Sequence, residues 1–178
     1  MTMKYNAVFF TVIILILASC EKYKDVPGDP NNPLLQRPYC NDPAGVNYNW
    51  DFPGKPDNAT CIYPADVFVG NYTYTDSIYD ASQSFIRAQV LNLNVSSSGQ
   101  EKIAISGFCP GSSISLTASR RLRADADTVV GFGQLLCRPT DTVTGAISRP
   151  DITGSVLFDF TVISDTGLNY HRGSAVKQ

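Results

Sequence analysis

The chain has 178 residues, and its 14 Lys and Arg against 16 Asp and Glu give it a formal net charge of −2. This mild acidity argues against a nucleic-acid partner, which would need a basic face. The length suits one domain with appendages.

Residues 1–19 have the layout of a secretory signal, with Lys4 near the start, an apolar run over 7–18 and small residues at its end. The run is shorter than the roughly 20 residues that a membrane-spanning helix needs. The tetrapeptide Leu17-Ala18-Ser19-Cys20 resembles the lipobox of bacterial lipoproteins. The resemblance implies that Cys20 is diacylated, becomes the mature N-terminus and anchors the chain to a membrane. We therefore expect a lipoprotein of the bacterial outer membrane, on its periplasmic or its surface face; the alternative is an ordinary signal peptide with an incidental cysteine.

Five cysteines are an odd number for an exported chain. Assigning Cys20 to the lipid leaves an even set of four, which we expect to be oxidised outside the cytoplasm. The pairs Cys40–Cys61 and Cys109–Cys137 are favoured because each lies within one segment, and the other two connectivities remain open. Cys-x-x-Cys spacing is absent and there is one histidine, so we expect no zinc or other metal site.

Residues 20–36 form a lipidated tether rich in proline, glycine and asparagine, without apolar periodicity. Such a stretch cannot bury enough apolar surface to offset its ordering entropy, so we expect it to be extended and flexible.

Residues 37–64 form a cysteine-bounded loop module in which turn formers dominate. A bridge from Cys40 to Cys61 closes about 20 residues and is worth roughly 3 kcal/mol in the chain-entropy model. The module resembles a short segment of surface and secreted proteins of the Bacteroidota, which carries no known catalytic residues. It departs from that pattern at Gly45 and Val46. The matching residues are Cys40, Asp42, Pro43, Asn47, Tyr48, Asn49, Asp57, Cys61 and Tyr63.

The Asn and Asp residues of this module raise the alternative of a calcium site, since calcium takes clustered oxygen ligands. No EF-hand spacing is present, and Asn and Asp are ordinary turn residues, so we favour turns.

Residues 65–178 alternate apolar and polar side chains with the period of β-strands, most clearly over 155–163. Turn residues separate the runs. These features predict an all-β domain, either a single antiparallel eight-stranded barrel or a β-sandwich, with the barrel favoured. The strand-like runs after the start of the domain are 85–95, 102–108, 113–119, 129–137, 143–148, 155–163 and 168–176.

The segment Phe68-Val69-Gly70-Asn71-Tyr72 is similar to the first strand of lipocalin-like barrels, in which a glycine precedes an aromatic residue by two positions. In that family an arginine of the last strand packs over the aromatic ring. The resemblance implies that Arg172 fills this place.

Residues for catalysis are sparse. His171 is the only histidine, and no Gly-x-Ser-x-Gly elbow supplies a nucleophile. We expect His171 to face solvent, Asp76 and Asp80 to flank the end of the first strand as ordinary turn residues, and Asp159 to point outward. We therefore predict no enzyme activity, no catalytic residue and no cofactor.

Arg120, Arg121 and Arg123 form the one basic cluster. The sharper interpretation is an anion-binding site for a glycan or a lipid phosphate, through the forked geometry of arginine. The alternative is a solvated strand end leading into a turn at residues 125–127, whose carboxylates neutralise it.

Two functional hypotheses follow from these features. The first is a lipid-anchored, non-catalytic module that binds a small apolar ligand, a glycan or a partner protein. The alternative is a structural or accessory subunit of an outer-membrane protein complex, with no small-molecule ligand. An open, apolar-lined cavity of roughly several hundred Å³ would favour the first, and a filled barrel with an exposed apolar patch would favour a protein partner.

Overall fold

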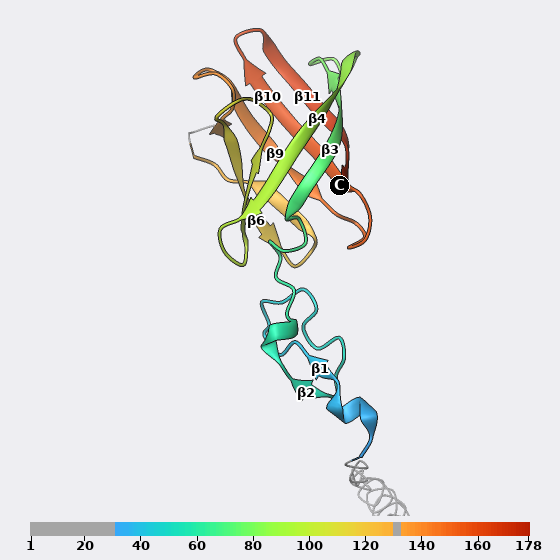
Figure 1. Ribbon diagram of the computed structural model, residues 1–178. Coiled ribbons are helices and arrows are strands. Elements are labelled where there is room, and N and C mark those ends of the chain that lie inside the picture. The colour runs from blue at the N-terminus through green and yellow to red at the C-terminus, as the bar shows by residue number, and fades with distance from the viewer. Residues whose placement is uncertain (1–30, 130–132) are drawn as a thin grey trace, which may run out of the picture. The chain divides into compact units, whose positions relative to one another are not determined.

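The computed structural model describes residues 31–129 and 133–178 (Figure 1). The predicted signal, Cys20 and the tether up to residue 30 lie outside the described residues. Residues 36–178 form one compact unit. No helix in the described ranges is long and apolar enough to cross a membrane.

Most of this unit is a closed antiparallel β-barrel, which confirms the all-β fold class and the barrel over the sandwich. Among the described residues eight strands follow one another around the barrel in the order β3-β4-β5-β6-β7-β9-β10-β11, and β11 pairs with β3 to close it. A short additional strand, β8, pairs with β9. The strands are β3 Gly70–Tyr79, β4 Phe85–Ser97, β5 Lys102–Ser106, β6 Ser113–Ser119, β7 Arg123–Ala126, β8 Gln134–Leu135, β9 Thr142–Ser148, β10 Val156–Ser164 and β11 Gly167–Lys177.

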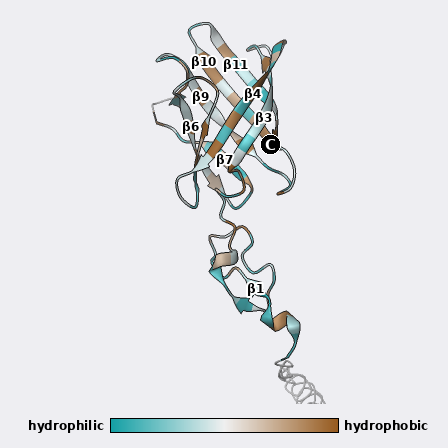
Figure 2. Ribbon diagram, in the orientation of Figure 1, coloured by the Kyte–Doolittle hydropathy of each residue, from teal (hydrophilic) through white to brown (hydrophobic). Residues whose placement is uncertain are grey.

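The barrel interior is filled by alternate residues of each strand. On β10, Val156, Phe158 and Phe160 are buried while Leu157 and Asp159 between them are exposed. Figure 2 shows the resulting alternation of hydrophobic and hydrophilic positions along β3 and β4. Each large apolar side chain that is fully buried contributes about 1.5–3 kcal/mol relative to exposure, so these strands supply most of the stabilising surface.

The strands have unequal lengths, and this leaves part of one strand without a partner. β4 has 13 residues, whereas β5 has 5. β5 pairs with β4 only from Asn94 to Ser97. Between residues 85 and 93, no described strand pairs with β4 on the side away from β3. The barrel wall is therefore taller on the side of β3 and β4 than on the side of β5.

The prediction of a strand over residues 129–137 is wrong. In the described part of this range only Gln134 and Leu135 are in a strand, and residues 130–132 lie outside the description. The wall is completed instead by β7, which includes residues expected in a turn. Ala124 faces the interior with no exposed surface, and Asp125 points outward to pair with Arg123 at 2.8 Å. An aspartate on the outer face of a strand costs little when its charge is solvated and paired, so turn chemistry was a poor guide here.

In the described part of the tether, a short 3₁₀ helix, η1 (Pro33–Gln36), stands where we expected extended chain. The loop module contains a second 3₁₀ helix, η2 (Asn58–Thr60), and a two-residue parallel pairing of β1 (Pro38–Tyr39) with β2 (Lys55–Pro56). The Cys40–Cys61 disulfide is present, as favoured from the sequence.

Several Asn and Asp side chains of this module bond to turn and loop backbone. Asp42 Oδ1 accepts from the amide of Ala44 at 2.9 Å, and Asp57 Oδ1 accepts from that of Ala59 at 3.0 Å, capping η2. Asn47 accepts the amide of Ile62 at 2.8 Å. These contacts are the ones expected of turn residues.

Candidate functional site

A buried carboxylate lies inside the barrel. Asp76 is on β3, and strand alternation puts it on the same inward face as Tyr72 and Tyr74, where it is only 1% exposed. The hydroxyl of Tyr74 donates to Oδ1 at 3.0 Å, and the amide nitrogen of Gln89 donates to Oδ2 at 3.0 Å. Nδ1 of His171, on β11, also lies 2.8 Å from Oδ2. Three neighbouring side chains therefore converge on one carboxylate.

These contacts keep Asp76 ionised. Burial by itself raises the pKa of Asp76, but the hydrogen bond and charge of His171, followed by the bonds from Gln89 and Tyr74, bring it below its usual value. Burial and the neighbouring Asp76 raise the pKa of the Tyr74 hydroxyl. The tyrosine therefore stays protonated and acts as a donor. An ionised carboxylate only accepts hydrogen bonds, so Nδ1 of His171 carries the proton that it shares with Asp76.

A cavity of about 100 Å³ adjoins this cluster. Its polar lining consists of Asp76, Gln89 and His171, which lie together at β3, β4 and β11. The rest is mainly apolar, so the cavity combines an apolar body with a small convergent polar group, as small-molecule sites do. Its volume is below the roughly 300–1,000 Å³ of a typical ligand pocket, so it has room only for a very small ligand. The apolar side chains are Leu91, Phe108, Ile114, Leu136, Val143, Phe160 and Val162.

His171 also lines an open hollow of about 650 Å³ at the ends of the β3–β4 and β10–β11 hairpins. Arg87 and Asp80 contribute one charge of each sign to this hollow. Because His171 belongs to both spaces, its ring stands between the inner cavity and the outer hollow. The side chain is 22% exposed.

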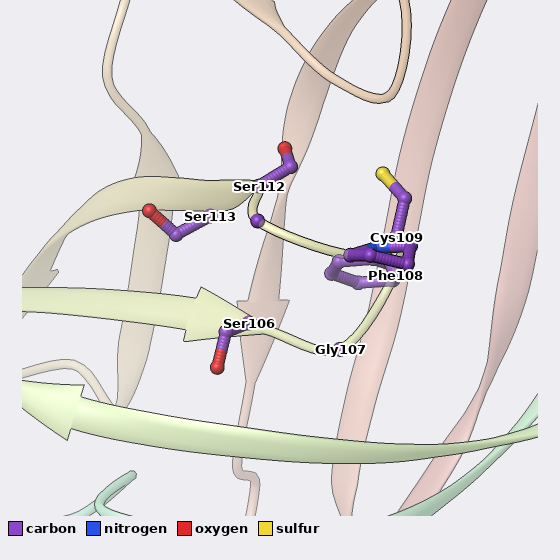
Figure 3. A pocket seen from close by; sticks show the side chains of 8 residues that line it. Ser106, Gly107, Phe108, Cys109, Ser112 and Ser113 are labelled. Atoms are coloured by element: carbon purple, nitrogen blue, oxygen red, sulfur yellow. The ribbon is translucent and has the colours of Figure 1, made fainter.

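The loop between β5 and β6 covers part of the cavity. Figure 3 shows this loop leaving β5 at Gly107, carrying Phe108 and Cys109, and returning to β6 at Ser113. These residues line an open hollow of about 600 Å³. The ring of Phe108 packs edge-on against Phe160, with centroids 6.1 Å apart. The Cys109–Cys137 disulfide joins this loop to the segment that follows β8, so the bridge holds the cover in place.

The favoured cysteine connectivity is thus confirmed for both pairs. The second bridge links two connecting segments, the β5–β6 loop and the segment after β8.

The expected position of Arg172 over the first-strand aromatic residue is wrong. Arg172 lies on the outer face of β11, where its Nε is 3.3 Å from Asp159 and its guanidinium lies 5.3 Å from the ring centroid of Tyr170. Strand alternation explains this, because His171, an inward residue, is its immediate neighbour. Asp159 is exposed, as expected.

The arginine whose charge lowers the pKa of the Tyr72 hydroxyl is Arg149, which follows β9. It is 9% exposed and donates to the carbonyl oxygens of Val67 and, at 3.1 Å, Gly154. Burial raises the pKa of Tyr72, and the charge of Arg149 opposes that rise.

The expectation for His171 is also wrong, since its ring is largely buried against Asp76. Asp76 and Asp80 do flank the end of the first strand, but Asp76 is buried inside the barrel and is not a turn residue. β3 continues to Tyr79, three residues beyond Asp76. The missed signal was the period of two from Tyr72 through Tyr74 to Asp76. Gln89 was missed as well, and it follows the same alternation from Leu93 and Leu91.

The three arginines of the basic cluster have different environments at the β6–β7 turn. Arg123 pairs with Asp125, and Arg120 lies 5.8 Å from the ring centroid of Tyr48. Arg121 is exposed, with no hydrogen bond or ion pair to any described residue. Anion binding at this turn stays a prediction.

No protein-family model matches the chain, and no curated protein or solved structure is significantly similar to it. Within residues 31–129 and 133–178, no group of three or more His, Cys, Asp or Glu side chains is placed to hold a metal ion.

Proposed function

We propose that the protein is a lipid-anchored lipoprotein of the bacterial envelope whose barrel is a non-catalytic module for a small, mainly apolar ligand. The leader pattern that ends at Cys20 supports the anchor. The interior cavity supports the ligand.

The observation that carries the binding proposal is the buried Asp76 cluster beside an apolar cavity. Placing a carboxylate inside a barrel is costly unless it is fully hydrogen-bonded. A leucine at this position would serve packing alone at least as well. The cluster therefore supports a role for this end of the interior beyond stability, and recognition of a ligand's polar end is the role its position favours.

The test is to purify the full-length lipoprotein from its native membrane in detergent, extract it with organic solvent and analyse the released small molecules by mass spectrometry. Leu91→Phe adds a ring at the cavity wall and should abolish any stoichiometric ligand. Leu157→Phe is the matched control, since Leu157 is exposed on the outer face of β10. Equal ligand content in wild type and Leu91→Phe, or no ligand in the wild type, would count against the proposal.

A second candidate is an accessory subunit of an envelope complex, and the unpaired edge of β4 favours it. An open strand edge can accept a strand from another protein. Three large apolar side chains on this stretch, Phe85, Ile86 and Val90, are 61%, 52% and 66% exposed. Replacing Val90 with Lys should then release partners that co-purify with the wild type. Leu157→Lys is the control, because Leu157 is exposed on β10 and pairs with β11 on one side and β9 on the other.

A further inference from the structure

We infer that the loop module docks on the surface of the membrane that holds the anchor, with the side chains of Trp50 and Phe52 in the interface of a zwitterionic phospholipid layer. This inference rests on the proposed function, because it requires the lipid anchor at Cys20. It adds a second contact between the chain and the membrane, made by aromatic side chains of the module.

The two rings are the most exposed aromatic side chains in the described part of the chain. Trp50 is 63% exposed and Phe52 is 65% exposed. They lie two positions apart in the loop that leads to β2. Single apolar residues are ordinary on a protein surface, whereas two large rings so close together mark a surface that meets an apolar partner.

The loop that carries the rings is ordered by its own contacts. The amide of Trp50 donates to the carbonyl oxygen of Asn47 at 3.2 Å. The amide of Phe52 donates to the carbonyl oxygen of Asn49 at 3.3 Å, and its ring packs edge-on against Tyr39 with the centroids 5.8 Å apart. The disulfide of the module closes the same segment. Because the loop is already ordered, little conformational entropy is lost when the rings bind.

The length of the chain before the module, and the point where it enters, favour the membrane as the partner. Arg37 follows Cys20 by 17 positions, so the link between them spans at most about 60 Å. The carbonyl oxygen of Arg37 accepts the amide of Lys55 at 2.8 Å, and Phe52 contacts Tyr39, two positions after Arg37. The rings therefore lie beside the point where the tether enters the module. A short link keeps the lipid surface at a high effective concentration, so a weak affinity of the rings is sufficient.

The charges beside the rings give no preference for an anionic surface. Two cations and two carboxylates adjoin the rings in this loop and at β1 and β2, and all four are exposed: Arg37, Lys55, Asp51 and Asp57. They cancel, and the whole chain has a net charge of −2. Aromatic rings, and tryptophan with its polar N–H in particular, are enriched at the headgroup level of bilayers without any need for charge. The surface that fits the rings is therefore a zwitterionic lipid interface.

The experiment uses the fluorescence of Trp50, which is the only tryptophan of the chain. Full-length lipoprotein in detergent is added to preformed phosphatidylcholine vesicles, the detergent is removed and the vesicles are floated. Emission is then measured with phosphatidylcholine brominated in its acyl chains and, separately, with iodide in the water. We expect the protein to float, the brominated lipid to quench about half of the emission, and iodide to quench little. Added phosphatidylglycerol or salt should change neither result.

Phe52→Ser removes one ring and should reduce quenching by the brominated lipid while increasing quenching by iodide. Phe85→Ser is the matched control, because Phe85 is 61% exposed on β4, outside the module, and should change neither. A protein that floats while Trp50 stays open to iodide and unquenched by the brominated lipid would overturn the inference and leave the anchor standing. Quenching that requires phosphatidylglycerol would overturn the zwitterionic preference. A protein that does not float would contradict the anchor of the proposed function, and the inference would fail with it. The wild-type measurement decides even if Phe52→Ser does not fold.

Discussion

Nδ1 of His171 lies 2.8 Å from Oδ2 of Asp76, although the two residues are 95 positions apart in the chain. The contact spans β3 and β11, the pair of strands whose meeting closes the barrel. It therefore ties the polar end of the interior to the closure of the fold.

Replacing Asp76 with Asn should destabilise the protein. Asn keeps the shape but removes the charge, and its NH₂ cannot accept the donors that the carboxylate now satisfies. Buried donors without acceptors cost about 1–3 kcal/mol. Chemical unfolding of the variant measures the loss, and Asp159→Asn, at an exposed carboxylate on β10, should change stability by less than about 0.5 kcal/mol. Equal losses in the two variants would contradict the importance of the cluster.

Stability should fall in acid through the aspartates whose pKa values are lowered, chiefly Asp76 and Asp127. Burial alone raises the pKa of both carboxyl groups, and their hydrogen bonds and neighbouring charges lower it by more. The largest lowering contribution comes from His171 at Asp76 and from Lys102 at Asp127. A carboxylate with a lowered folded-state pKa stabilises the fold above the unfolded-state value of about 3.9, and this contribution is lost as the pH falls through the folded-state value. Urea unfolding between about pH 7 and pH 2 should show this decline, and Asp76→Asn should make it shallower. An unchanged slope of unfolding stability against pH in Asp76→Asn would contradict this prediction.

Removing the Cys109–Cys137 bridge by double replacement with Ala should both destabilise the fold and loosen the cover over the cavity. The bridge closes 28 residues, which corresponds to about 3.5 kcal/mol in the chain-entropy model. Fluorescence of an apolar dye should rise in this variant because the Phe108 loop is no longer held. Removing Cys40 and Cys61 should cost a similar amount without the increase in dye binding. A similar dye signal in both variants would show that the second bridge does not hold the cover.

Gly107→Ala should be more damaging than Gly111→Ala, although both glycines have positive φ, 109° and 74°. A Cβ at Gly107 would lie 2.3 Å from the carbonyl oxygen of Asn92 on β4, whereas one at Gly111 meets nothing within 4 Å. Both variants carry a backbone strain of about 1–3 kcal/mol, but only Gly107→Ala adds a steric clash. Thermal melting of the two variants separates these effects. Equal melting temperatures would mean that the loop moves to relieve the contact.

The fold class was predictable because an interior side chain recurs at every second residue, and residues 156–162 show this without interruption. Strand β7 was not predictable in this way. Ala124 and Ala126 are too small to give an apolar signal, and Arg123 and Asp125 resemble turn residues. The site was hidden for a related reason. Asp76 and His171 are polar residues on inward positions, and their burial depends on each other through a pairing between the first and last strands of the barrel. The sequence around Asp76 does not indicate that His171 is its partner, and the sequence around His171 does not indicate Asp76.

Because β11 closes the barrel by pairing with β3, a chain that lacks β11 cannot form the closed barrel. Register runs from Tyr170 opposite Tyr79 to Lys177 opposite Tyr72, so the last residues of the chain meet the first strand of the barrel. A product that ends before Gly167 would lack β11 and leave β3 and β10 with long open edges, which invite aggregation. Chains that lack β11 would thus differ from chains that carry it in a way that proteases and chaperones can detect.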